Sequence, residues 1–161
     1  MDFVTGGTGF IGAHVVRAPL RRGRSVRCLV RASSRLDNLE ELPVEVVAGD
    51  VTDRASLSRA MAGARWVFHC AADYRLSARR PGEIYAANVA GTENVLAAAA
   101  EVGAERVVYT SSVGALGLPG TAGPATRRRR SSPVPSSGTT RRASTRRKAS
   151  LWNGPAEGCR S

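Results

Sequence analysis

The feature that most constrains this sequence is a glycine-rich run, residues 5–12, in which four of the eight positions are glycine. Phe3 and Val4 precede it and predict a short strand. From position 10 onward apolar residues recur at helical spacing, at positions 10, 11, 15, 16 and 20, and Gly23 ends this pattern. The sequence therefore predicts a strand that enters a helix through a glycine loop, which is the first unit of an α/β fold.

Short apolar runs and helical patterns then alternate, which is typical of βαβ units. The sequence predicts an α/β fold class, a Rossmann-type doubly wound parallel sheet. We expect strands at residues 3–4, 26–30, 44–47, 66–68 and 107–109, and helices at 10–20, 55–61 and 84–102. Pro19 falls inside the first helix, and we interpret it as a local defect because proline removes a helical hydrogen bond.

Charge divides the 161 residues into two parts. The formal net charge is +11, of which residues 121–161 carry +9 and residues 1–120 only +2. Periodicity also stops after Leu118, and two basic stretches follow it, 127–130 and 141–148. We expect an incomplete nucleotide-binding Rossmann segment at 1–118 and a disordered basic tail at 119–161.

Several classes of protein are excluded by this sequence. No apolar run approaches the ~20 residues of a membrane helix, and no signal peptide is visible, so neither a membrane partner nor secretion is expected. The three cysteines, Cys28, Cys70 and Cys159, are far apart and match no metal-ligand spacing. They predict reduced thiols in a cytoplasmic protein with no metal site.

The glycine loop predicts a phosphate-binding site. Gly6 permits the tight turn, Gly9 lets the backbone approach a pyrophosphate, and Gly12 lets the helix pack against the strand. The helix N-terminus adds free N–H groups and partial positive charge. The alternative is a glycine-rich turn that binds nothing. The predicted strand, loop, helix and second strand together favour a dinucleotide.

The end of the second strand distinguishes NADP from NAD. NAD sites usually place a carboxylate there, whereas this sequence has Arg31, with Ser33, Ser34 and Arg35 near it. A guanidinium suits the 2′-phosphate of NADP, so NADP is the favoured cofactor and NAD remains possible. The alternative is that Arg31 is a solvated surface residue.

Asp50, directly after the third strand, has two interpretations. Its carboxylate could accept a hydrogen bond from an adenine amine. It could equally belong to an ordinary turn or cap the next helix, a role for which Asp53 competes. The residues alone leave these open.

Five motifs together resemble one known family in order and spacing. They are residues 5–12, 49–51, 69–72, 88–94 and 109–112. The set resembles the extended short-chain dehydrogenase/reductase family, the NAD(P)-dependent epimerase/dehydratase group. Residues 71–76 most resemble dihydroflavonol-4-reductase-like proteins and the hopanoid-associated sugar epimerase. The resemblance covers residues 1–118.

The resemblance implies roles for matching positions. Ser112 would be the catalytic serine that holds the substrate oxygen, although a strand-end serine in a turn explains it as well on sequence alone. Ala71 and Ala72 would lie beside the nicotinamide ribose, and Asn88 would stabilise the sheet near the active site. The residues expected at the cofactor are Thr5, Gly6, Gly9, Phe10, Ile11, Gly12, Arg31, Asp50, Val51, Ala71, Ala72, Asn88, Thr110 and Ser111.

The family's chemistry also needs a tyrosine and a lysine four residues apart. None of the three tyrosines has such a partner, and the only lysine is Lys148. Residues 138–145 would read Tyr-x-x-x-Lys after a shift of one nucleotide with suitable codons. Our hypothesis is that the tail is read out of frame from about residues 118–121, which makes this chain an N-terminal fragment.

These observations predict an NAD(P)-dependent oxidoreductase or epimerase that acts by hydride transfer. Its substrate would be a small carbonyl or nucleotide-sugar-like molecule, and the chain alone would be inactive. The resemblance implies that full-length relatives are homodimers. One alternative is a non-catalytic dinucleotide-binding protein. Another is non-specific nucleic-acid binding through the basic tail, while specific binding is not expected because no nucleic-acid module is recognisable.

Overall fold

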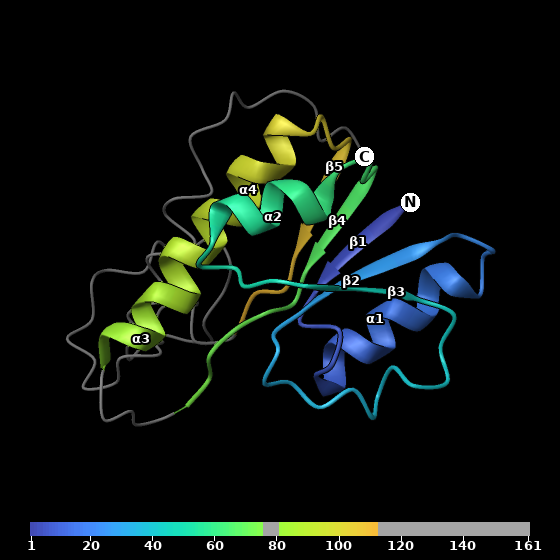
Figure 1. Ribbon diagram of the computed structural model, residues 1–161, viewed down its shortest axis with the longest axis horizontal. Helices are drawn as coiled ribbons and strands as arrows, with labels where there is room; N and C mark the ends of the chain where they lie inside the picture. Colours follow the sequence, from blue (N-terminus) through green and yellow to red (C-terminus); the bar gives the residue numbers. More distant parts are fainter. Residues whose placement is uncertain (76–80, 113–161) are drawn as a thin grey trace, which may run out of the picture.

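The computed structural model describes residues 1–75 and 81–112. Five parallel strands form one sheet in the order β3-β2-β1-β4-β5 (Figure 1). The strands are β1 (Asp2–Thr5), β2 (Val26–Val30), β3 (Glu45–Ala48), β4 (Trp66–His69) and β5 (Arg106–Tyr109). The helices are α1 (Phe10–Leu20), α2 (Arg54–Met61), α3 (Pro81–Tyr85), the π-helical η1 (Ala86–Ala90) and α4 (Gly91–Glu101). The predicted α/β fold class with a Rossmann-type parallel sheet is confirmed.

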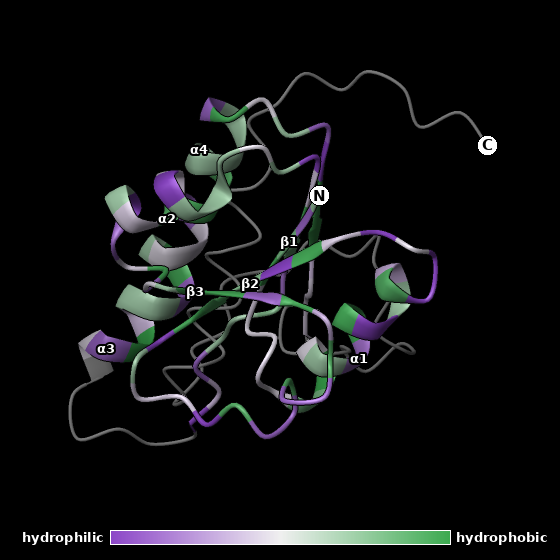
Figure 2. Ribbon diagram, turned by 45° about the vertical axis from the view of Figure 1, so that its right-hand side comes forward, coloured by the Kyte–Doolittle hydropathy of each residue, from purple (hydrophilic) through white to green (hydrophobic). Residues whose placement is uncertain are grey.

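Helices cover both faces of the sheet (Figure 1). On one face α2 and α4 pack on a core of Phe3, Leu29, Leu57, Ala60, Met61, Ala64, Val67, Val95, Ala98 and Ala99. On the other face α1 packs on Val4, Val16, Val26, Cys28, Val30 and Leu39. Adjacent residues of β1 thus enter opposite cores, which explains why the central strands are apolar on both sides. The loop between β2 and β3 is mostly hydrophilic (Figure 2).

The expected helix over residues 84–102 differs from the observed one. The helical segment already includes Pro81 and contains a π-helical turn at η1 before α4. At the end of that turn, the Gly91 N–H bonds to the Ala86 carbonyl, five residues back. Such π-turns frequently mark functional sites. Apolar periodicity alone predicts one uninterrupted α-helix here.

Pro19 lies in the last turn of α1, where its side chain is buried. The helix ends one residue later, at Leu20. The Pro19 carbonyl accepts the N–H groups of Arg22 at 2.9 Å and Arg24 at 3.1 Å. The proline therefore packs in the core at the end of α1, and the backbone bonds around it close the helix rather than kink its interior.

Three further findings concern the described part of the chain. None of its helices is long and apolar enough to cross a membrane. It contains no group of three or more histidines, cysteines or acids that could hold a metal ion. Cys28 and Cys70 are free thiols in it. Cys159, the expected disordered tail at 119–161 and the proposed change of reading frame lie outside the described residues.

Candidate functional site

The carboxyl ends of the parallel strands meet at one edge of the sheet. Thr5 at the end of β1 pairs with Leu29 of β2 and with His69 of β4, and His69 pairs with Tyr109 of β5. Backbone bonds extend the pairing beyond the strands, from Cys70 N–H to the Thr5 carbonyl and from Thr110 N–H to the His69 carbonyl, both 3.0 Å long. The segments that leave these strands therefore lie together, at the edge where ligands bind in such sheets.

The glycine loop after β1 packs too closely for side chains. Gly6 has a φ of +74°, and a Cβ there would lie 2.6 Å from the Ala71 nitrogen. A Cβ on Gly12 would lie 1.9 Å from the Gly6 carbonyl oxygen. Gly9 is the N-cap of α1, and its N–H bonds to the Gly6 carbonyl at 3.1 Å. Glycine is thus required at Gly6 and Gly12 by the geometry of the loop.

The N-terminus of α1 begins directly after Gly9 of this loop. No side chain of the described residues caps this helix, and its first turn contains no acidic residue. Phe10 and Ile11 in that turn are 79% and 56% exposed. An uncapped helix N-terminus carries unsatisfied N–H groups and partial positive charge, which together favour a phosphate.

Arg31 follows β2 at the same edge and is exposed. Asp73, after β4, is mostly buried, and its pKa is lowered mainly by the hydrogen bonds from the Arg75 guanidinium, with a further contribution from the charge of Arg31. Arg31 and the ion pair of Asp73 with Arg75 thus place both signs of charge on the segments that follow β2 and β4.

Asp50 and Asp53 have separate roles after β3. Asp53 caps α2, because its carboxylate accepts the N–H groups of Ala55 at 3.0 Å and Ser56 at 3.2 Å. Asp50 instead closes a turn, in which its Oδ1 accepts the N–H and the hydroxyl of Thr52, each at 2.8 Å. Asp50 is therefore not the helix cap.

Val51 is half-buried and packs on the core beneath α4. Its carbonyl accepts a hydrogen bond from the Asn94 side chain at 3.1 Å, and a Cβ added to Gly91 would lie 2.8 Å from its Cγ2. The turn that contains Asp50 and Val51 is thereby held by α4 as well as by β3.

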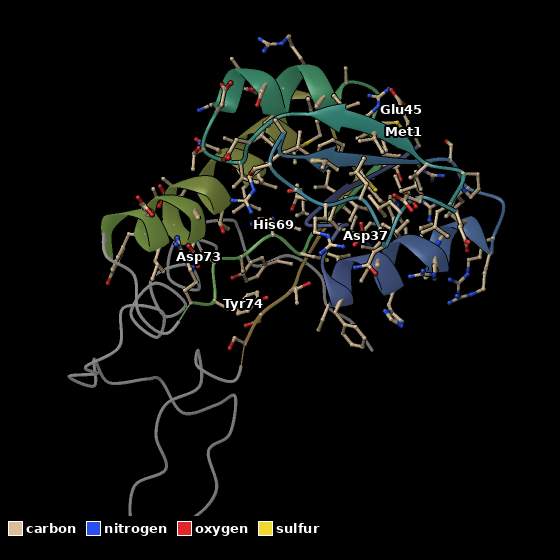
Figure 3. All side chains as sticks on the ribbon, turned by 60° about the horizontal axis from the view of Figure 1, so that its bottom comes forward. Met1, Asp37, Glu45, His69, Asp73 and Tyr74 are labelled. Carbon is tan, nitrogen blue, oxygen red and sulfur yellow. The ribbon has the colours of Figure 1, made fainter. Side chains whose placement is uncertain are left out.

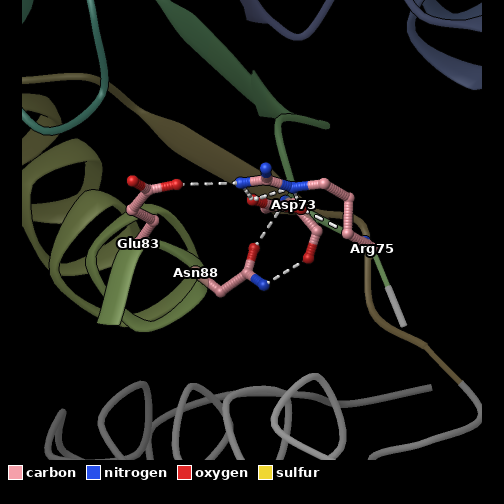
Figure 4. Close-up of polar contacts among 4 residues, drawn as sticks. All are labelled: Asp73, Arg75, Glu83 and Asn88. Carbon is pink, nitrogen blue, oxygen red and sulfur yellow. Dashed lines mark hydrogen bonds and ion pairs between the residues drawn. The ribbon is translucent and has the colours of Figure 1, made fainter. Parts of the chain in front are cut away.

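Asn88, which lies in η1, binds the segment after β4 (Figure 4). Its Oδ1 accepts the Asp73 N–H at 2.8 Å, and its Nδ2 donates to the Asp73 carbonyl at 2.6 Å. Arg75 donates to the Asp73 carboxylate and pairs with Glu83 of α3. Asn88 thus fixes the course of the chain just beyond Ala71 and Ala72, where Ala71 is half-buried and Ala72 exposed.

Thr110, Ser111 and Ser112 follow β5 at the same edge. The Thr110 hydroxyl donates to the Cys70 sulfur at 3.3 Å, which joins the ends of β4 and β5. Burial raises the pKa of the Cys70 thiol, while this hydrogen bond opposes the rise. Ser111 and Ser112 are exposed. The structure therefore places the expected catalytic serine at the ligand-binding edge.

Sequence reasoning assigned no individual role to three polar residues that shape this edge. Asn38 donates to the Thr8 carbonyl at 2.8 Å and so supports the glycine loop from the loop after β2. His69 and Thr92 are buried and hydrogen-bonded to each other at 3.0 Å. Both occur in the recognised motifs, but no local pattern shows which partners they meet. Nothing in the sequence distinguishes Asn38 from other loop residues.

Comparisons with known proteins agree with this geometry. The sequence model of the NAD dependent epimerase/dehydratase family matches residues 3–141. A protein of Synechocystis sp. named "Putative dihydroflavonol 4-reductase" is 52% identical over 118 residues, which are 73% of this chain and 34% of that protein. The chain thus spans about a third of the length of this curated relative.

Solved structures show the same arrangement. The crystal structure of gox2253 has a TM-score of 0.86 and 39% identity, over 94% of this chain and 46% of that one. The Bordetella bronchiseptica enzyme WbmG, solved with NAD and UDP, has a TM-score of 0.81 and 27% identity, over 93% of this chain and 48% of that one. The resemblance drawn from the motifs is confirmed: this chain belongs to the NAD dependent epimerase/dehydratase family.

Proposed function

We propose that this chain binds a nicotinamide dinucleotide, NADP in preference to NAD, and supplies the dinucleotide-binding part of a reductase or epimerase. The observation that carries the proposal is the uncapped N-terminus of α1 behind a loop in which Gly6 and Gly12 have no room for a Cβ. A loop of this kind brings backbone N–H groups to a pyrophosphate. The residues of the loop and of the first turn of α1 therefore fit a nicotinamide dinucleotide.

Each part of the dinucleotide has its expected residues. The pyrophosphate would bind at Gly9 and the first turn of α1, including the N–H groups of Phe10 and Ile11. The adenine would lie by the turn of Asp50 and Val51. The nicotinamide ribose would lie by Ala71 and Ala72, next to the segment that Asn88 holds. Thr5 and Thr110 would support this arrangement from the ends of β1 and β5, beside Ser111.

The preference for NADP depends on Arg31. The first residue after β2 is this exposed arginine, where an NAD site usually has an aspartate or a glutamate. Asp37, farther along the same loop, pairs with Arg35 at 2.7 Å. A guanidinium attracts a 2′-phosphate, whereas a carboxylate would repel it.

The reaction we propose is hydride transfer to or from a small carbonyl or nucleotide-sugar-like substrate. The nicotinamide supplies the hydride chemistry when it is bound. From this chain, the Ser112 hydroxyl would hydrogen-bond the substrate oxygen and orient it at the edge of the sheet. The name of the Synechocystis relative supports a carbonyl substrate, and the UDP bound to WbmG supports a substrate that carries a nucleotide.

The test is a fluorescence titration of the chain with NADPH and with NADH. Arg31→Ala should weaken NADPH binding at least tenfold and leave NADH binding within twofold, because one charge-assisted contact is lost (about 1.5–3 kcal/mol). Arg21→Ala is the matched control, since it removes an exposed arginine at the C-terminal end of α1, away from the glycine loop, and should change neither affinity. Equal weakening of both dinucleotides by Arg31→Ala would reject the NADP preference. A chain that binds neither would reject the proposal.

A further inference from the structure

A buried histidine connects two parts of the candidate site. His69 is the last residue of β4 and is 1% exposed, inside the fold (Figure 3). Its Nδ1 lies 2.7 Å from the Thr5 Oγ1, and its Nε2 lies 3.0 Å from the Thr92 Oγ1. Both threonines are fully buried. One imidazole ring thus joins the end of β1 to the start of α4.

One assignment of hydrogens satisfies all of these groups in the neutral ring. The Asn88 carbonyl, 2.9 Å from the Thr92 Oγ1, can only accept; with the Thr92 hydrogen in that bond, the hydrogen between Thr92 and His69 comes from Nε2. Nδ1 is then the acceptor, and the Thr5 hydroxyl donates to it. The Thr5 oxygen in turn accepts the Ala71 N–H at 3.3 Å.

The two ends of this hydrogen-bond chain lie at the places where the dinucleotide would bind. At one end, the Ala71 nitrogen contacts the glycine loop, since a Cβ on Gly6 would lie 2.6 Å from it. At the other end, Asn88 holds the backbone of Asp73 through its side-chain amide. This hydrogen-bond chain therefore connects the glycine loop, the segment after β4 and the π-helical turn.

We propose that His69 is a positioning residue of the dinucleotide site, an inference that rests on the proposed function. Held as the Nε2–H tautomer, it orients the Thr5 hydroxyl so that the Thr5 oxygen accepts the Ala71 N–H. The His69 ring, which lies on the far side of Thr5, thereby sets the distance between the glycine loop and residues 71–73. Thr92 fixes the tautomer from α4.

The first test is the ¹⁵N NMR spectrum of the unmodified chain, because ring nitrogens with and without hydrogen give well-separated shifts. The chain has two histidines. His14 is the internal control: its Nδ1 lies 2.9 Å from the Phe10 carbonyl, which can only accept, so in the neutral ring Nδ1 carries the hydrogen. His69 should show hydrogen on Nε2 and His14 on Nδ1, with assignment through His14→Gln. Hydrogen on Nδ1 of His69 would overturn the inference.

The second test is a double-mutant cycle on dinucleotide binding and on hydrogen exchange of the Ala71 amide. Thr92→Val keeps the shape of the side chain and removes its hydroxyl. It should weaken dinucleotide binding about fivefold and raise Ala71 exchange by a similar factor, the equivalent of one hydrogen bond. In a His69→Phe background the same substitution should change neither quantity, because the connection is already broken. Ser58→Ala, which removes the exposed hydrogen bond from the Ser58 hydroxyl to Glu101, is the control.

The outcomes separate this inference from the proposed function. Equal effects of Thr92→Val with and without His69 would show general destabilisation and overturn the positioning role. If the unmodified chain binds no dinucleotide, the proposed function fails, and the Ala71 exchange still decides the hydrogen-bond chain. If hydrogen exchange of the Ala71 amide is unchanged in both the Thr92→Val and the His69→Phe variants, the hydrogen-bond chain is overturned.

Discussion

Asn88 shows how much one side chain can determine at the candidate site. It is 1% exposed, and both its amide groups bond to the backbone of Asp73. Asn88→Ala should lower the free energy of unfolding by about 2 kcal/mol, because the Asp73 N–H and carbonyl lose their partner away from water. Urea unfolding followed by circular dichroism measures this. Asn94→Ala is the control: Asn94 is half-exposed, so water can replace its bonds, and a loss as large as that of Asn88→Ala would contradict the prediction.

Asp2 predicts a pH dependence of stability. Burial raises the pKa of its carboxyl above 3.8, although the Arg24 guanidinium opposes this, and its Oδ2 has no hydrogen-bond partner among the described residues. Because the folded pKa lies above the unfolded one, the contribution of this group is complete below pH 3.8 and is lost as pH rises through the raised pKa. The free energy of unfolding of the native chain, minus that of the Asp2→Asn variant, should therefore fall as the pH rises through this window. A rising difference would show that the ion pair with Arg24 outweighs burial.

At the scale of elements, the junction of β1, its loop and α1 depends on Gly12. Gly12→Ala should destabilise the fold by at least about 2 kcal/mol, since the new Cβ meets the Gly6 carbonyl oxygen and the loop must move. Gly82→Ala is the matched control, because Gly82 is also helical and an added Cβ would meet no atom of the described residues within 4 Å. That substitution should stabilise α3 by about 0.5–1 kcal/mol. Thermal unfolding compares the two, and similar effects would refute the role of the close contact.

Local sequence patterns predict some elements better than others. All five strands could be predicted to within about one residue at each end from apolar runs. The inner strands β1, β2 and β4 are largely buried and need apolar side chains, whereas the edge strands β3 and β5 are more exposed and are marked only by short valine pairs. The π-helical turn could not, because the packing of Gly91 on Val51 and the bond between Thr92 and His69 are tertiary contacts. The glycine loop was predictable since backbone geometry restricts it to glycine. The pairing of Asn88 with Asp73 depends on segments that only the fold brings together.

At the scale of the whole molecule, the candidate site joins the two halves of the sheet. One core cluster lies under α1 and the other under α2 and α4, and β1 contributes Val4 to the first and Phe3 to the second. The glycine loop leaves β1 at the point where the chain order reverses, between β2 and β4. A dinucleotide that bridges the loop, Arg31 and the Asp50 turn would therefore contact segments anchored in both clusters.

This bridging predicts that dinucleotide binding stabilises the whole domain. NADPH at one hundred times its dissociation constant should raise the free energy of unfolding by about 2.7 kcal/mol, because it binds the folded chain alone. Hydrogen exchange should slow in the segments after β1, β2, β3 and β4 and change little at the amino ends of the strands. Inorganic pyrophosphate is the control, since it can occupy the N-terminus of α1 but cannot reach Arg31 and the Asp50 turn together. It should protect the glycine loop only. If NADPH also protects the glycine loop alone, its adenosine half does not bind at Arg31 and the Asp50 turn.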